Sequence, residues 1–111
     1  MKIVTLEKEI NENDEKLVLV SLLGTLIAIE RNSLSIAEAE KFLFSPYMIS
    51  KLRLKKCDEK ILNILERGCE LEDIASLIPY EMDNAISELE KMTLELLKSY
   101  KNFERDHWIK G

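Results

Sequence analysis

The run Leu17–Ile29 is apolar at nearly every position and contains no charged residue. A helix that is apolar all round is normally buried by its neighbours. Along one stripe the side chains are small, at the spacing i, i+3, i+4 and i+7 that shares one helix face. The residues of this stripe are Ser21, Gly24, Thr25 and Ala28. Small side chains let another backbone approach closely, so we expect a core helix that is covered on all sides.

Glycine and proline are scarce, with three and two copies in 111 residues. Folds rich in β-strands need many more turn residues, so this scarcity favours an all-α protein. Apolar residues make up 46% of the chain and charged residues 33%, as in globular proteins. A chain of this length buries enough surface for one hydrophobic core. We therefore expect a single helical domain over residues 1–111.

Capping signals and apolar spacing divide the chain into helices. Ser35 and Glu38 form a capping box, and Gly68 is expected to stop a helix. Further expected helix starts are capped by Asn13, Ser45 and Asp58, and further expected helix ends lie at Asn32 and before Pro79. The expected helices run from Asn13 or Asp14 to Arg31, from Ile36 to Phe44, over Pro46–Lys56, Glu59–Arg67 and Glu70–Ile78, and from Tyr80 to Arg105. The predicted fold is a compact bundle of about five or six helices, with long first and last helices and short helices between them. Irregular structure is expected in residues 1–12 and 107–111, although the first of these segments is also compatible with a helical extension or a short strand.

The formal net charge is −5, and a negatively charged protein repels the phosphate backbone of nucleic acids. The 13 residues of Leu17–Ile29 are fewer than the roughly 20 that span a bilayer. The first residues lack the pattern of a secretory signal. We therefore predict a cytoplasmic protein outside the membrane, with Cys57 and Cys69 kept as thiols.

The sequence contains few histidine and cysteine residues, two types that often carry out catalysis. The only histidine is His107, and eleven residues separate Cys57 from Cys69, a spacing that does not match a zinc site. The three glycines are isolated, so the chain contains no glycine-rich phosphate loop. Because a nucleophile, a base and an orienting group are not recognisable together, we predict no enzyme, no cofactor and no metal.

Carboxylates are concentrated between Glu66 and Glu95, where nine of them stand against only Arg67 and Lys91. Such a run is usually a solvated face. Alternatively, it is a docking surface for a basic partner protein. The segment from Phe42 to Met48 is rich in aromatic residues, which favours core packing unless one of them is exposed. The candidate partner-binding residues are Glu66, Glu70, Glu72, Asp73, Glu81, Asp83, Phe44 and Tyr47.

Several runs resemble a family of small uncharacterised proteins from Gram-positive bacteria (Firmicutes). These runs are Leu22–Glu30, Leu34–Glu40, Phe44–Pro46, Glu70–Ile74 and Ser76–Pro79. The resemblance covers most of the chain but implies no activity and gives no residue a role. By analogy alone, small acidic proteins of this kind are similar in character to immunity proteins, which neutralise secreted bacterial toxins.

Three functions follow as hypotheses. The leading one is a non-enzymatic protein-binding module, such as an immunity protein that covers the basic surface of a toxin. The second is a nucleic-acid-binding regulator that uses the basic helix Lys51–Lys56, which holds four cations in six residues. The third is a structural subunit that forms a homodimer through an exposed part of the last helix.

Overall fold

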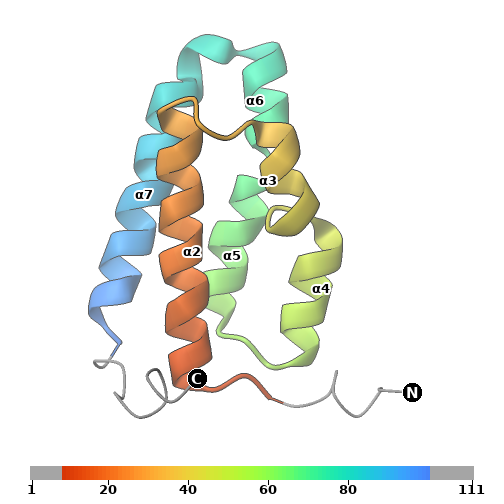
Figure 1. Cartoon of the computed structure of the whole chain (residues 1–111), viewed down its shortest axis with the longest axis vertical. Coiled ribbons are helices and arrows are strands. Elements are labelled where there is room, and N and C mark those ends of the chain that lie inside the picture. Colours follow the sequence, from red (N-terminus) through yellow and green to blue (C-terminus); the bar gives the residue numbers. More distant parts are fainter. Residues whose placement is uncertain (1–8, 101–111) are drawn as a thin grey trace.

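Residues 9–100 are described by the computed structural model, and all regular structure among them is helical (Figure 1). The elements are α2 (Glu12–Glu30), α3 (Ile36–Phe42), α4 (Pro46–Leu54), α5 (Glu59–Gly68), α6 (Leu71–Leu77), the 3₁₀-helix η1 (Pro79–Glu81) and α7 (Met82–Lys98). The predicted all-α class is confirmed, with long helices of 19 residues in α2 and 17 in α7. The bundle has fewer substantial helices than the five or six expected, because α3 and α6 contain only seven residues each.

The helices α2 and α7 lie side by side and run in opposite directions, and they form the most extensive helix–helix contact (Figure 1). The helix α5 packs against both of them. At one end of the molecule, α6, η1 and the start of α7 project beyond the C-terminal end of α2 (Figure 1). We call residues 70–83 the tip.

The core is built from apolar side chains that these helices direct toward one another. Fully buried members include Leu19, Leu22 and Leu26 of α2 and Leu62 and Leu65 of α5. Each such side chain contributes roughly 1.5–3 kcal/mol when it leaves water. The hydrophobic core therefore depends on contacts between elements that are far apart in the sequence.

Capping side chains fix the starts of α3, α4 and α5 where the sequence predicts them, whereas α6 and α7 begin without a side-chain cap. In α3, the Glu38 N–H donates to Ser35 Oγ at 3.1 Å and the Ser35 N–H donates to Glu38 Oε1 at 2.9 Å, which confirms the capping box. The start of α2 differs from the prediction. Its cap is Asn11, not Asn13, because the Asn11 side chain accepts the Asp14 N–H at 2.8 Å.

The last helix also has different bounds from those predicted. A 3₁₀ turn at Pro79–Glu81 precedes α7, which ends at Lys98. The Ser99 hydroxyl donates to the Leu96 carbonyl at 2.6 Å and occupies an acceptor that the next helical turn would have used. Residues 101–105 of the expected helix lie outside the described residues, as does the segment 107–111.

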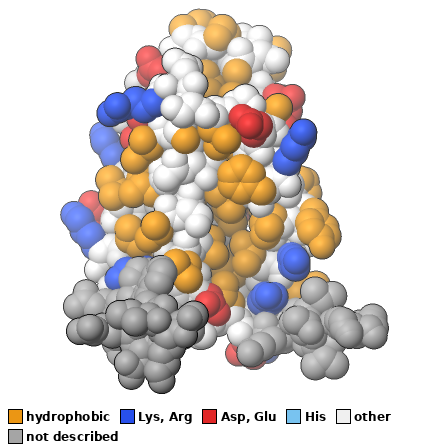
Figure 2. Space-filling view, viewed as in Figure 1, with side chains coloured by type: hydrophobic (Ala, Val, Ile, Leu, Met, Phe, Trp, Pro, Cys, Tyr) orange, Lys and Arg blue, Asp and Glu red, His pale blue; other side chains and the backbone are white. Residues whose placement is uncertain are grey.

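The expectation that α2 is covered on all sides is wrong. Val20 is 45% exposed and Ile27 is 41% exposed, and a Cβ atom added at Gly24 would meet nothing within 4 Å. Only Thr25 of the small-residue stripe is buried, and its hydroxyl donates to the Ser21 carbonyl at 2.8 Å. The core covers one face of α2 and leaves the opposite apolar face open. Figure 2 shows apolar side chains along the middle of the side on which α2 lies.

Candidate protein-binding surface

The tip brings together most of the predicted partner-binding carboxylates. These are Glu70, Glu72, Asp73, Glu81 and Asp83, contributed by α6, by η1 and by the residues next to them. All except Glu81 are exposed, and Glu81 is half-buried. Because no lysine or arginine occurs between Glu70 and Asp83, the tip carries five carboxylates without a cation of its own.

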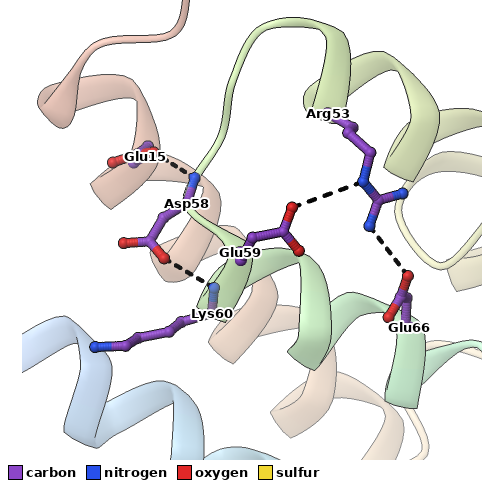
Figure 3. Close-up of polar contacts among 6 residues, drawn as sticks. All are labelled: Glu15, Arg53, Asp58, Glu59, Lys60 and Glu66. Atoms are coloured by element: carbon purple, nitrogen blue, oxygen red, sulfur yellow. Dashed lines mark hydrogen bonds and ion pairs between the residues drawn. The ribbon is translucent and has the colours of Figure 1, made fainter.

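Glu66 lies outside the tip, in the last turn of α5. Its Oε2 atom accepts a hydrogen bond from an Arg53 guanidinium nitrogen, Nη2, at 3.2 Å (Figure 3). Arg53 Nε also lies 3.8 Å from Glu59 Oε2. An intramolecular cation therefore neutralises Glu66, which distinguishes it from the carboxylates of the tip.

The two aromatic candidates have different surroundings. Phe44 is only 2% exposed and is part of the core, so it does not meet the condition for a partner anchor. Tyr47 is 70% exposed and meets that condition, but it lies on α4, which is separate from the tip (Figure 1). The ammonium group of Lys51 is 5.7 Å from the centre of the Tyr47 ring, close enough for a cation–π contact.

The sequence reasoning missed the apolar side chains of the tip. Leu77 is 76% exposed and Tyr80 is 79% exposed, and Ile78 between them is also exposed. Their signal in the sequence is the run of large apolar residues on both sides of Pro79, a residue that by itself predicts only the end of a helix. Large apolar side chains that are exposed together are typical anchor residues for a partner protein.

A cavity of about 730 Å³ opens between the tip and the rest of α7. Its apolar lining includes Leu71 and Ile74 of α6 and Leu89 of α7. Its polar lining includes Arg67, Glu70, Glu81, Glu88 and Lys91. Arg67 Nη2 and Glu88 Oε1 are 3.0 Å apart and join α5 to α7 at this cavity. The cavity thus combines an apolar lining with carboxylates at Glu70 and Glu81.

The carboxylates of the tip lie outside the ion pairs of the described residues, and two of them lie close to a further carboxyl group, that of Glu40. Within residues 9–100, the ion pairs engage other carboxylates and none of the five at the tip. Desolvation, a hydrogen bond with Glu72 and the negative charges of Glu72 and Asp73 raise the pKa of Glu40 on α3. Desolvation is the largest of these causes and the charges of Glu72 and Asp73 add to it, so the Glu40 carboxyl group favours its neutral form beside the tip.

The basic segment Lys51–Lys56 is not helical throughout, because α4 ends at Leu54 and Lys56 has a positive φ angle. Its cations are partly neutralised within the molecule. Arg53 pairs with Glu66 and Glu59, and Lys56 Nζ lies 3.3 Å from Glu9 Oε2. Lys51 lies over the Tyr47 ring. These contacts reduce the positive potential that phosphate binding needs.

Metal-ligand groups, membrane-spanning helices and cysteine thiols are further features that would bear on function in the part of the chain that the structure describes. Residues 9–100 contain no group of three or more metal-ligating side chains. None of their helices is both long enough and apolar enough to cross a membrane. Cys57 and Cys69 are free thiols, and burial together with the charges of Glu15 and Asp58 raises the pKa of Cys57 to about 12. His107 lies outside the described residues.

The geometry defines an all-α domain whose projecting tip combines carboxylates with exposed apolar side chains. The chain belongs to the family described as "Protein of unknown function (DUF3969)", whose model matches residues 9–110. The expected membership of an uncharacterised family is thereby confirmed. No curated protein and no solved structure matches the chain.

Proposed function

We propose that this protein is a non-enzymatic module that binds a basic partner protein through its tip. The observation that carries the proposal is the presence of five carboxylates and three exposed apolar side chains on one projecting end, without a lysine or arginine between Glu70 and Asp83. Carboxylates accelerate and select the encounter with a basic surface. Apolar anchors such as Tyr80 supply the burial that holds the complex together.

The cavity beside the tip suggests how a basic side chain is received. Lysine and arginine place their methylene groups on apolar surface while the charged head stays at a polar edge. Leu71 and Ile74 provide the apolar surface, and Glu70 and Glu81 provide the carboxylates. The lining also contains two cations, Arg67, which is paired with Glu88, and Lys91. A partner segment that inserts one lysine or arginine here would fit both parts of the lining.

In its most specific form, the proposal is a cytoplasmic immunity protein that covers the basic surface of a toxin. A standard interface buries about 800 Å² on each partner. The accessible surface of the chain is 7470 Å², so such an interface needs only about a tenth of it. The size of the domain is therefore compatible with this function.

Titration calorimetry of the purified chain against candidate basic toxin domains tests the proposal. The triple variant Glu70→Gln/Glu72→Gln/Asp73→Asn is expected to weaken binding and reduce its salt dependence. The matched control is Glu12→Gln/Glu59→Gln/Glu95→Gln, which removes the same charge away from the tip. Equal affinities of the two triple variants would contradict a role for the carboxylates of the tip.

A second variant separates the apolar contribution from the charge. Tyr80→Ala removes an aromatic ring that is 79% exposed, so it should leave folding intact while weakening binding at every salt concentration. Truncation of an interface anchor typically costs about 2 kcal/mol or more. Tyr47→Ala is the control, because it removes a ring that is 70% exposed from α4, outside the tip.

A further inference from the structure

The open face of α2 has a regular pattern. Its central stripe follows alternating steps of four and three residues, which keep side chains in line along a helix. The stripe consists of Asn13, Leu17, Val20, Gly24, Ile27 and Arg31. All six are exposed or half-buried, whereas Leu19, Leu22 and Leu26 on the opposite face are fully buried.

This face is uncharged over most of its length. Between Leu17 and Ile29 the helix carries no ionisable residue, although a third of the chain is charged. The outer face of a helix in a monomeric protein is normally polar. A face that is apolar and solvent-exposed is typical of a surface that another chain covers.

The stripe is complementary to itself when two copies run in opposite directions. With the crossing point at residue 22, the larger Val20 of one copy lies opposite Gly24 of the other, and the contact occurs twice. Leu17 of each copy then lies opposite Ile27 of its partner. Because a Cβ atom at Gly24 would meet nothing within 4 Å, there is room for the Val20 side chain.

Charges at the two ends of the stripe favour the same arrangement. Arg31 comes to the height of Asn13 in the other copy, one residue away from the exposed carboxylate of Glu12. The same arrangement keeps the negative tips apart, since each tip projects beyond the C-terminal end of its own α2 (Figure 1). A parallel arrangement would place both tips at one end, where they repel each other.

We propose that a second copy of this chain covers the open face of α2 and forms an antiparallel two-fold dimer. The 19 residues of α2 span about 28 Å. The area that one helix stripe can bury is smaller than the roughly 800 Å² that each partner buries in a standard interface. The adjoining surface of α7 must therefore add to the contact. We therefore expect a reversible dimer and not a permanent one. This inference does not depend on the function proposed for the tip, which stays accessible in the dimer.

Sedimentation equilibrium over a wide range of protein concentration tests the dimer. The unchanged chain should shift from monomer to dimer as the concentration rises. Gly24→Gln fills the space that receives Val20, and it should raise the dissociation constant by about tenfold or more. The variant should fold, because glutamine favours a helix more than glycine does and position 24 is open.

Two further variants control for specificity and orientation. Ser50→Gln makes the same side chain at an exposed position of α4 and should leave the dissociation constant unchanged. Arg31→Glu should weaken the dimer, and Glu12→Arg combined with Arg31→Glu should restore it by exchanging the charges. A chain that is monomeric at every concentration, or a dimer that tolerates Gly24→Gln, would overturn the proposal.

Discussion

The aromatic ring of Phe44 lies directly against the backbone of Gly68. A Cβ atom at Gly68 would be 2.5 Å from Cδ1 and Cε1 of the ring, closer than two carbon atoms can approach. Gly68 is also the last residue of α5 and does not have a positive φ angle. Its lack of a side chain therefore serves the packing of Phe44 and does not serve to end the helix.

Alanine substitution should have opposite effects at two glycines. Gly68→Ala should lower the free energy of unfolding by about 1–3 kcal/mol, because the buried ring has to move. Gly24→Ala should raise it by up to about 1 kcal/mol in the monomer, since alanine favours the helix and the added methyl group meets no neighbour. Urea denaturation at low protein concentration measures both. Phe44→Leu should reduce the cost of Gly68→Ala, and an unchanged cost would contradict the steric explanation.

The carboxylate of Glu15 joins three parts of the chain. Its Oε2 atom accepts the Asp58 N–H at 2.7 Å (Figure 3), and its Oε1 atom accepts the Tyr100 hydroxyl at 3.1 Å. Glu15→Ala leaves both donors without this acceptor and should cost about 1–3 kcal/mol of stability. Tyr100→Phe removes one of the two hydrogen bonds and should cost less. Glu12→Ala, at an exposed position of the same helix, is the control in thermal unfolding.

Glu90 on α7 should make the domain less stable at neutral pH. Desolvation and the neighbouring carboxyl group of Glu30 raise its pKa above 4.5, and its Oε2 atom is buried without a hydrogen-bond partner among the described residues. An acid with a raised pKa in the folded state stabilises the fold below its unfolded pKa, and that contribution is lost as the pH rises through the folded pKa. Glu90→Gln should therefore raise the melting temperature at pH 7.

The pH dependence of this gain identifies its cause. The difference in stability between Glu90→Gln and the unchanged chain should shrink as the pH falls toward 4.5, where Glu90 is increasingly protonated. Glu95→Gln removes the same charge from α7 but breaks an ion pair with Lys98, so it should bring no gain. A gain for Glu90→Gln that is the same at pH 7 and pH 4.5 would argue against relief of carboxylate repulsion.

Cys57 should react only when the domain unfolds. Its thiol is buried, and a pKa of about 12 in place of 9.0 makes the reactive thiolate about a thousandfold scarcer at neutral pH. The rate of iodoacetamide labelling at Cys57, followed by mass spectrometry of peptides, should therefore increase with urea in step with global unfolding. Labelling of Cys57 at the rate of a free thiol in the native chain would be inconsistent with this burial.

Local chemistry made the helix starts predictable. Ser35, Ser45 and Asp58 each accept a backbone N–H at the start of the next helix, as their sequence context indicates. Asn32 takes up the left-handed backbone that the sequence suggested for the end of α2. These features depend on neighbours within a few residues, so a single sequence contains the information.

Tertiary contacts decided what the sequence left undetermined. A helix that is apolar on both faces, as α2 is, gives no periodic signal for which face the core will cover. The carboxylates of the tip were recognised from the charge run, but Glu66 was not distinguished from them because its partner Arg53 lies on another helix. The exposure of Tyr80 and the burial of Phe44 likewise depend on packing between distant segments.

The contact between α2 and α7 also constrains how the domain forms during translation. The partner helix of α2 is synthesised about fifty residues later. The apolar inner side of α2 therefore lacks its α7 contacts in the nascent chain until α7 has been synthesised. The hydrogen bond between Glu15 and Tyr100 spans 85 positions in the sequence and forms only after that. Folding is thus expected to be completed late, by the docking of α7, and to be slower than in a bundle whose neighbouring helices are consecutive.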